Sequence, residues 1–133
     1  MDTKNLTGTI HNAMYQNIRQ KGFAAPVDVL MDIGVLEKKD YEDWRFGRIP
    51  FLEKVCHANL RQLSAIMSEV RAYAVKNKLK PSWTFYHQYG TNRKNKLRFS
   101  KSGDEKIETA YATHYVDVQK IGQLKETTNM EEN

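Results

Sequence analysis

The stretch that decides the fold is residues 50–81, PFLEKVCHANLRQLSAIMSEVRAYAVKNKLKP. Apolar positions recur within it in alternating steps of four and three residues, which is the spacing of one helical face. These positions are Cys56, Leu60, Leu63, Met67, Val70 and Ala74, and the stripe is widened by Leu52, Val55, Ile66 and Tyr73. A stripe this wide is typical of a helix packed against a core. Since Pro81 disfavours helix in the residue before it, the pattern predicts a central helix over residues 50–79, the longest element of the chain.

The chain before this stretch shows the patterns of three further helices. The first is predicted over residues 3–20 from apolar residues at every fourth position, with Asp2 or Thr3 as its cap and Lys21-Gly22 as its stop. A second, short helix begins at Pro26 and ends before Gly34. A third is predicted over residues 39–46, with Gly47 as its stop.

The chain after it changes to the alternation of β-strands. Residues 83–89 and 97–99 alternate around the turn-forming residues 90–95, which predicts a β-hairpin over residues 83–100 with a basic tip. We expect Trp83, Phe85 and Phe99 to form its core face.

Ser102 and Glu105 have the spacing of a capping box and predict a last helix. Its packed face would hold Ile107, Ala110 and Tyr111, with His114 or Tyr115. Residues 1–118 would then form one domain, and residues 119–133 a frayed polar tail.

Composition indicates a soluble globular domain in a reducing compartment. The chain has 133 residues, 40% of them hydrophobic and 28% charged, which suits a single packed core. Its one cysteine, Cys56, excludes an intramolecular disulfide. Neither a secretory signal nor a membrane-spanning apolar run is visible, so we expect a cytoplasmic protein with no membrane partner.

The formal net charge of +5 is unevenly distributed. Residues 70–103 contain no Asp or Glu and hold nine basic residues, Arg71, Lys76, Lys78, Lys80, Arg93, Lys94, Lys96, Arg98 and Lys101. The remainder holds 12 basic and 16 acidic residues, a net charge of −4. Such an asymmetry can attract polyanions although the total charge is modest.

Residues 22–117 also resemble a family of small bacterial proteins of no established function. The resemblance is carried by PVDVLM at residues 26–31, DYEDWR at 40–45, GRIP at 47–50 and RFSKSGD at 98–104. It implies a bacterial cytoplasmic source, and it brings no activity, cofactor or binding residue that could be transferred to this chain.

The acid-free segment favours a nucleic-acid-binding protein, because cations neutralise phosphates and aromatic rings stack on exposed bases. The expected phosphate contacts are Arg93, Lys94, Lys96, Arg98 and Lys101, with Lys76, Lys78 and Lys80 beside them. Tyr86 or His87 would stack on a base of DNA or RNA. The plainer interpretation is a hairpin with a core face and a solvated basic face.

A helix-turn-helix over residues 26–47 is disfavoured, because its second helix carries Asp40, Glu42 and Asp43, which phosphates would repel. These residues, with Glu37 and Glu53, instead suggest a rival function. This acidic surface could pair with the basic segment of the same molecule or of a second copy. Alternatively, the basic segment could bind an acidic surface of another protein. The protein would then be a protein-interaction or self-associating module.

Metal and catalytic chemistry have weak support in the sequence. Cys56 and the four histidines are scattered, and the one helical pair, Glu53 with His57, is of a kind common by chance. Residues 99–104 could hold a phosphate before a helix, although a plain capping turn is favoured. No catalytic motif is present, so we expect no cofactor, and an enzyme is disfavoured unless a pocket brings His114, Tyr111 and Arg45 together.

The sequence therefore predicts a mainly helical α+β domain, winged-helix-like, built around one central helix. Its leading function is nucleic-acid binding in an accessory or regulatory role through the basic hairpin.

Overall fold

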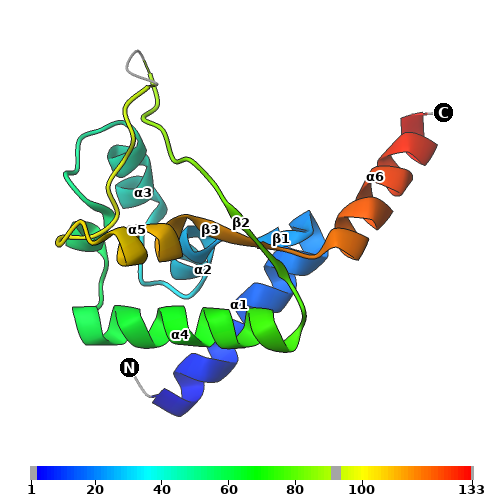
Figure 1. The fold of residues 1–133 in the computed structure, drawn as a ribbon, viewed down its shortest axis with the longest axis horizontal. Coiled ribbons are helices and arrows are strands. Elements are labelled where there is room, and N and C mark those ends of the chain that lie inside the picture. Colours follow the sequence, from blue (N-terminus) through cyan, green and yellow to red (C-terminus); the bar gives the residue numbers. More distant parts are fainter. Residues whose placement is uncertain (1–2, 91–93, 133) are drawn as a thin grey trace.

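The computed structural model describes residues 3–90 and 94–132, with side chains for residues 5–90 and 94–127. Its helices are α1 (Thr3–Lys21), α2 (Pro26–Asp32), α3 (Lys38–Arg45), the 3-10 turn η1 (Leu52–Val55), α4 (Leu60–Lys76), α5 (Glu105–Ala112) and α6 (Val118–Glu132). Its strands are β1 (Phe23–Ala24), β2 (Lys80–Trp83) and β3 (Thr113–Val116) (Figure 1). The predicted α+β class is confirmed, and so are the three N-terminal helices to within one or two residues.

A small antiparallel sheet joins distant parts of the chain. Its strand order is β1-β3-β2, so β3 lies in the middle. Phe23 pairs with Val116 on one side of β3, and Lys80 pairs with the same Val116 on the other. Residues 113–116 were predicted as helix, and their place in a sheet is a correction. The winged-helix arrangement is not confirmed.

The core lies between the crossing helices α1 and α4 and the sheet (Figure 1). An aromatic group fills the part nearest α3 and α5. Trp44 packs at 5.8 Å from Tyr86 and 5.1 Å from Phe99, measured between ring centroids, and Phe99 stacks on Tyr111 at 5.5 Å. The indole Nε1 of Trp44 donates a hydrogen bond to the carbonyl oxygen of Arg98. Trp44 thereby ties α3 to a segment 54 residues away.

The central helix α4 begins at Leu60, ten residues later than predicted. Asn59 caps it: its side chain accepts from the Gln62 N–H, and the Gln62 side chain accepts from the Asn59 N–H. This reciprocal box stops the helix from extending backwards although the apolar periodicity continues. The longest element among the described residues is therefore α1, with 19 residues against 17 in α4.

The predicted hairpin over residues 83–100 does not form a two-stranded ladder within the described residues. Its arms share one isolated bridge, between His87 and Lys96, and the extended chain before it pairs with β3 instead. The predicted core face was wrong at two of three positions. Phe99 is buried, but Trp83 and Phe85 are 54% and 40% exposed. We call residues 84–90 and 94–100 the projecting loop; its two described arms extend beyond the helices in Figure 1.

Two C-terminal predictions also need correction. Asp104, not Ser102, caps α5, because its side chain accepts from the N–H groups of Lys106 and Ile107. The segment expected to be a frayed tail is helix α6, which leaves the body beside β1 (Figure 1). The Asp117 side chain stabilises its first turn by accepting a hydrogen bond from the Lys120 N–H.

The α4 packing gives a matched test of the core. Val70 is fully buried and Val75 is 79% exposed on the same helix. Val70→Ala should lower the free energy of unfolding by about 2–3 kcal/mol, because it removes two buried methyl groups and leaves a cavity. Val75→Ala should change it by less than about 0.5 kcal/mol. Urea denaturation followed by circular dichroism measures both, and equal effects would contradict the assigned helix faces.

Candidate nucleic-acid interface

Four rings line one side of the extended chain that leaves β2. Trp83, Phe85, His87 and Tyr89 alternate with inward-facing residues, and we call them the aromatic ladder. Successive ring centroids are 6.2, 6.4 and 6.0 Å apart. Trp83, Phe85 and Tyr89 are exposed, and His87 is partly buried. Large exposed rings in series are unusual for a plain surface and are typical of a stacking platform.

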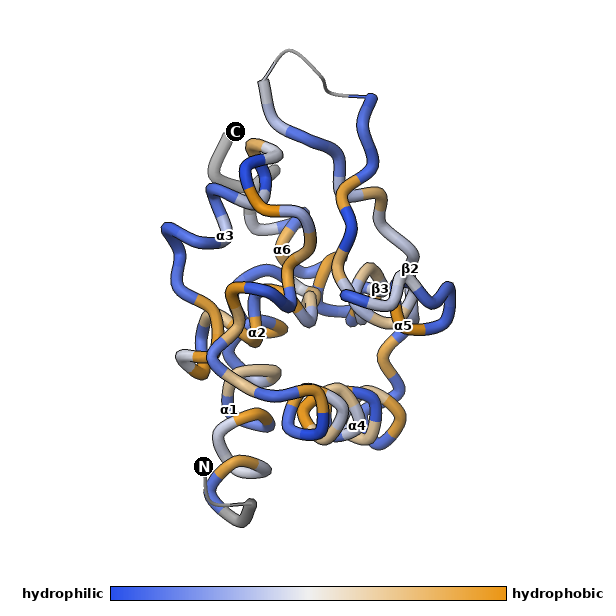
Figure 2. The backbone as a smooth tube through the Cα atoms, turned by 90° about the vertical axis from the view of Figure 1, so that its left-hand side faces the viewer, coloured by the Kyte–Doolittle hydropathy of each residue, from blue (hydrophilic) through white to orange (hydrophobic). Residues whose placement is uncertain are grey.

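Cations lie beside the aromatic ladder. The Lys96 ammonium is 5.7 Å from the centre of the Trp83 ring, and Lys80 and Lys94 are exposed nearby in the chain. Both arms of the projecting loop contain strongly hydrophilic segments (Figure 2). Arg93, also predicted as a phosphate contact, lies outside the described residues.

The predicted lysines fall into two groups. Lys76 and Lys78 lie at the C-terminal end of α4, before β2 begins at Lys80. Lys94 and Lys96 lie in the projecting loop, beyond the other end of β2 (Figure 1). All are exposed, and within the described residues none of them pairs with a carboxylate. The predicted site is thus divided between the two ends of one strand.

Arg98 and Lys101 have structural contacts that the sequence did not indicate. The Arg98 guanidinium donates from Nε to the carbonyl oxygen of Ser100, at 2.8 Å, and from a terminal nitrogen to that of Lys101. Arg98 therefore stabilises the turn that follows it. The backbone N–H of Lys101 donates to the Glu53 carboxylate. The Lys101 side chain takes no part in this bond and is exposed.

Two carboxylates fasten the base of the projecting loop through its main chain. Glu108 accepts from the N–H groups of Phe99 and Ser100, at 2.9 and 2.7 Å, and from the Ser100 hydroxyl. Glu53 accepts from the Tyr111 hydroxyl at 2.8 Å as well as from Lys101. Burial and this hydrogen bond raise the pKa of Tyr111. Both carboxylates accept hydrogen bonds from backbone N–H and hydroxyl groups, and neither forms an ion pair with a described lysine of the acid-free segment.

Arg45 fixes the far end of the aromatic ladder, a role that was not predicted from the sequence. Its guanidinium carbon lies 4.1 Å from the Tyr89 ring centre and 5.1 Å from that of Tyr86. Its carbonyl oxygen accepts from the Tyr89 N–H at 2.6 Å. Arg45 is 7% exposed, and ring faces stabilise its charge in place of a carboxylate.

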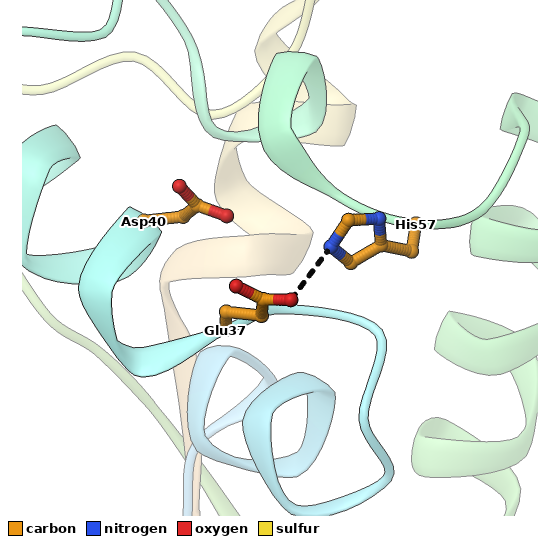
Figure 3. A group of neighbouring side chains, drawn as sticks. All are labelled: Glu37, Asp40 and His57. Carbon is orange, nitrogen blue, oxygen red and sulfur yellow. Dashed lines mark ion pairs between the residues drawn. The ribbon is translucent and has the colours of Figure 1, made fainter.

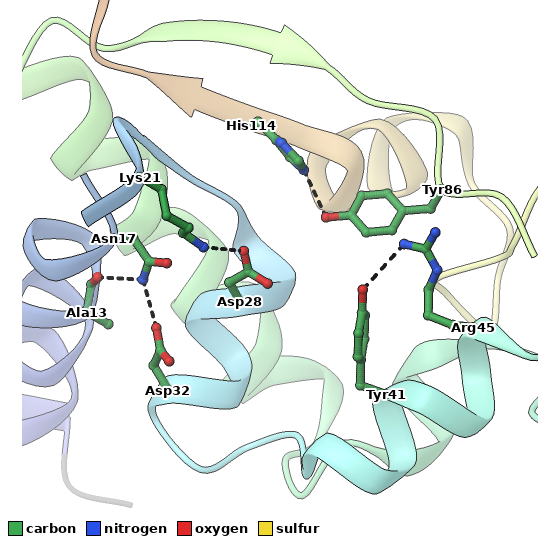
Figure 4. A network of polar contacts seen from close by, with 9 residues as sticks. All are labelled: Ala13, Asn17, Lys21, Asp28, Asp32, Tyr41, Arg45, Tyr86 and His114. Carbon is green, nitrogen blue, oxygen red and sulfur yellow. Dashed lines mark hydrogen bonds and ion pairs between the residues drawn. The ribbon is translucent and has the colours of Figure 1, made fainter. Parts of the chain in front are cut away.

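The sequence suggested Tyr86 or His87 as the residue that stacks on a base, and of the two Tyr86 is buried in the core. The side chain is 7% exposed, and its hydroxyl shares a hydrogen bond of 2.9 Å with His114 Nε2 (Figure 4). Burial raises the pKa of Tyr86 above its usual value. His87, the alternative, does lie in the aromatic ladder.

A polar hollow of about 610 Å³ lies between α1, α2 and α3. Three of its charged groups are partnered: Lys21 pairs with Asp28 at 2.7 Å, and Asp32 accepts from Asn17 at 2.7 Å (Figure 4). The trio expected of a hidden active site is not assembled. His114 and Arg45 both contact Tyr86, whereas Tyr111 binds Glu53 elsewhere.

One group among the described residues has ligand atoms suited to a divalent cation. The ligand atoms of Glu37, Asp40 and His57 lie within 4.8 Å of one another (Figure 3). His57 Nε2 lies 3.5 Å from Glu37 Oε1, so an ion pair already accounts for the arrangement when the imidazole is protonated. Glu53, which the sequence spaces one helical turn from His57, instead binds the Lys101 N–H and the Tyr111 hydroxyl.

Cys56 is a poor metal ligand and nucleophile. Burial raises the pKa of its thiol to about 12, with smaller contributions from the charges of Glu53 and Asp40. The thiolate is the reactive and metal-binding form, so the group remains protonated at neutral pH.

Comparisons with protein families, with curated proteins and with solved structures gave no match to this chain. This agrees with a resemblance that brings no established activity. No helix among the described residues has both the length and the apolar character needed to cross a membrane.

Glu108 offers a test of how the loop is fastened. Glu108→Gln places an amide N–H₂ against N–H donors and should lower the free energy of unfolding by about 1–3 kcal/mol. Glu105→Gln is the matched control on α5, since Glu105 is exposed and has no hydrogen-bond partner among the described residues. Thermal denaturation of both variants measures the difference, and equal melting temperatures would contradict the fastening role.

We expect His114 to make the free energy of unfolding depend on pH. Burial lowers its pKa, and the nearby charges of Asp28 and Lys21 act in opposite directions. In the unfolded chain the imidazole takes up a proton near pH 6.5, whereas in the folded chain it does so only at a lower pH. The free energy of unfolding should therefore fall as the pH drops below about 6.5. Denaturation at a series of pH values should show a weaker decline in His114→Gln. An unchanged decline would assign the effect to other groups.

Proposed function

We propose that this protein binds single-stranded nucleic acid through the aromatic ladder and the cations beside it. The observation that carries the proposal is the solvent exposure of Trp83, Phe85 and Tyr89 in one continuous series. Bases of a single strand have exposed faces that stack on such rings, whereas bases inside a duplex do not.

The charge distribution supports the same function. Lys94 and Lys96 are free of carboxylate partners within the described residues and neutralise phosphates of a strand lying on the ladder. Lys76, Lys78 and Lys80 continue the positive surface at the other end of β2. This geometry favours tolerance of sequence, because stacking and phosphate contacts are available to every nucleotide.

The alternative is a protein-interaction or self-associating module. It is favoured by an apolar hollow of about 340 Å³ between α4 and α5, beside the exposed side chains of Leu60 and Ile107. Arg71, Lys101 and Lys106 surround this hollow and would suit an acidic partner. Light scattering tests self-association by comparing the wild type with a variant whose charge is reversed at Asp40, Glu42 and Asp43. Self-association predicts that the wild type is an oligomer and that the variant is a monomer.

The two tryptophans permit a direct test of stacking. Trp83 is exposed and Trp44 is fully buried, so quenching of fluorescence by an oligonucleotide reports on Trp83. We expect oligothymidine and oligouridine to quench it more strongly than duplex DNA, with an affinity that falls as salt rises. Absence of binding at low salt, or an affinity indifferent to salt, would contradict the proposal.

Substitutions separate the aromatic from the electrostatic contribution. Phe85→Ala should weaken oligothymidine binding about tenfold, from the loss of about 1–3 kcal/mol of stacking per base. Lys94→Glu with Lys96→Glu should weaken it further and flatten the salt dependence. The matched control is Lys39→Glu with Lys125→Glu, which makes the same charge change at exposed sites away from the ladder. Equal losses in both double variants would indicate an effect of net charge alone.

A further inference from the structure

A second hollow lies directly beside the aromatic ladder. It has a volume of about 420 Å³ and separates the start of the projecting loop from α5. Its lining includes Trp83 and Lys96 from the extended chain and Glu105 and Thr109 from α5, with Leu97 and Phe99 among its buried residues. The exposed Trp83 indole and polar groups of the helix therefore border one space, in which a flat aromatic ring can lie.

Two carboxylates line this hollow, and only one is free to bind a ligand. Glu108 already accepts three hydrogen bonds from Phe99 and Ser100. Glu105 is exposed, and within the described residues its carboxylate has neither a hydrogen-bond partner nor an ion-pair partner. Glu105 thus supplies two acceptor oxygens to a site that also contains the cation Lys96 and the hydrogen-bonded carboxylate of Glu108.

We propose that this hollow is a guanine-selective base pocket; the inference rests on the proposed single-strand binding and names its preferred base. The guanine ring lies against Trp83, and the Glu105 carboxylate accepts from the N1–H and the exocyclic N2–H of its Watson–Crick edge. Lys96 neutralises a phosphate of the same nucleotide. Splayed-out bases of single strands are recognised by this combination of stacking and edge hydrogen bonds.

The selectivity follows from the pattern of donors on each base. Guanine presents two adjacent donors, which match the two oxygens of a carboxylate. Adenine and cytosine each present one amino donor beside a ring nitrogen that accepts, and this acceptor would face the second carboxylate oxygen. Uracil and thymine present one N–H between two carbonyl oxygens. Unpaired acceptors facing a carboxylate are unfavourable, so only guanine satisfies both oxygens.

The test compares oligothymidine with the same strand carrying one central guanine, by fluorescence anisotropy at fixed salt. We expect the guanine to raise the affinity about tenfold, as a bidentate contact does. Replacing guanine by hypoxanthine removes the exocyclic amine and should abolish most of this gain. Glu105→Gln should also abolish it without weakening oligothymidine binding, because its amide offers guanine one acceptor and one donor in place of two acceptors. Glu126→Gln, an exposed substitution of the same kind on α6, is the control.

The outcomes distinguish this inference from the function on which it rests. Binding of oligothymidine without any gain from guanine overturns the pocket and leaves single-strand binding intact. A guanine preference that survives Glu105→Gln overturns the role of Glu105. No binding of any strand overturns the proposed function and the pocket together.

Discussion

The burial of Tyr86 determines which side chains of the projecting loop face solvent. Its ring lies among Trp44, Phe99 and His114, and its hydroxyl is bonded to His114. Side chains alternate along an extended chain, so an inward Tyr86 turns Phe85 and His87 outward. The aromatic ladder is therefore a direct consequence of one buried ring. A shift by one residue would bury Phe85 and His87 and place Tyr86 in water.

The fastening of the loop keeps its lysines available. Glu53 and Glu108 would be the natural neutralising partners of a basic segment, yet their oxygens are occupied by main-chain N–H and hydroxyl groups. Hydrogen bonds between carboxylates and such donors are stronger than neutral ones and hold the chain in one path. The fold is thus stabilised by acidic residues without a loss of positive charge at the surface.

Sequence periodicity predicted the fold well where contacts are local. The helix over residues 3–20 and the stops at Gly34 and Gly47 were confirmed, since they depend on near neighbours. The start of α4 was wrong because the apolar stripe continues through η1, and only the Asn59–Gln62 box marks the boundary.

The faces of residues 83–86 could not be obtained from alternation, which gives the period but not the phase. Phase depends on Trp44 and His114, which are distant in sequence. Arg45 was missed for the same reason, because its ring partners Tyr86 and Tyr89 come from another part of the chain.

The position of β3 between β1 and β2 has a consequence for how the chain folds during synthesis. β1 ends at Ala24 and β2 at Trp83, but neither has its hydrogen-bonding partner until residues 113–116 leave the ribosome. The N-terminal helices therefore form early on local contacts, while two strand edges remain open. Sheet closure is a late step that joins both ends of the domain, and until then the nascent chain presents unpaired edges to its surroundings.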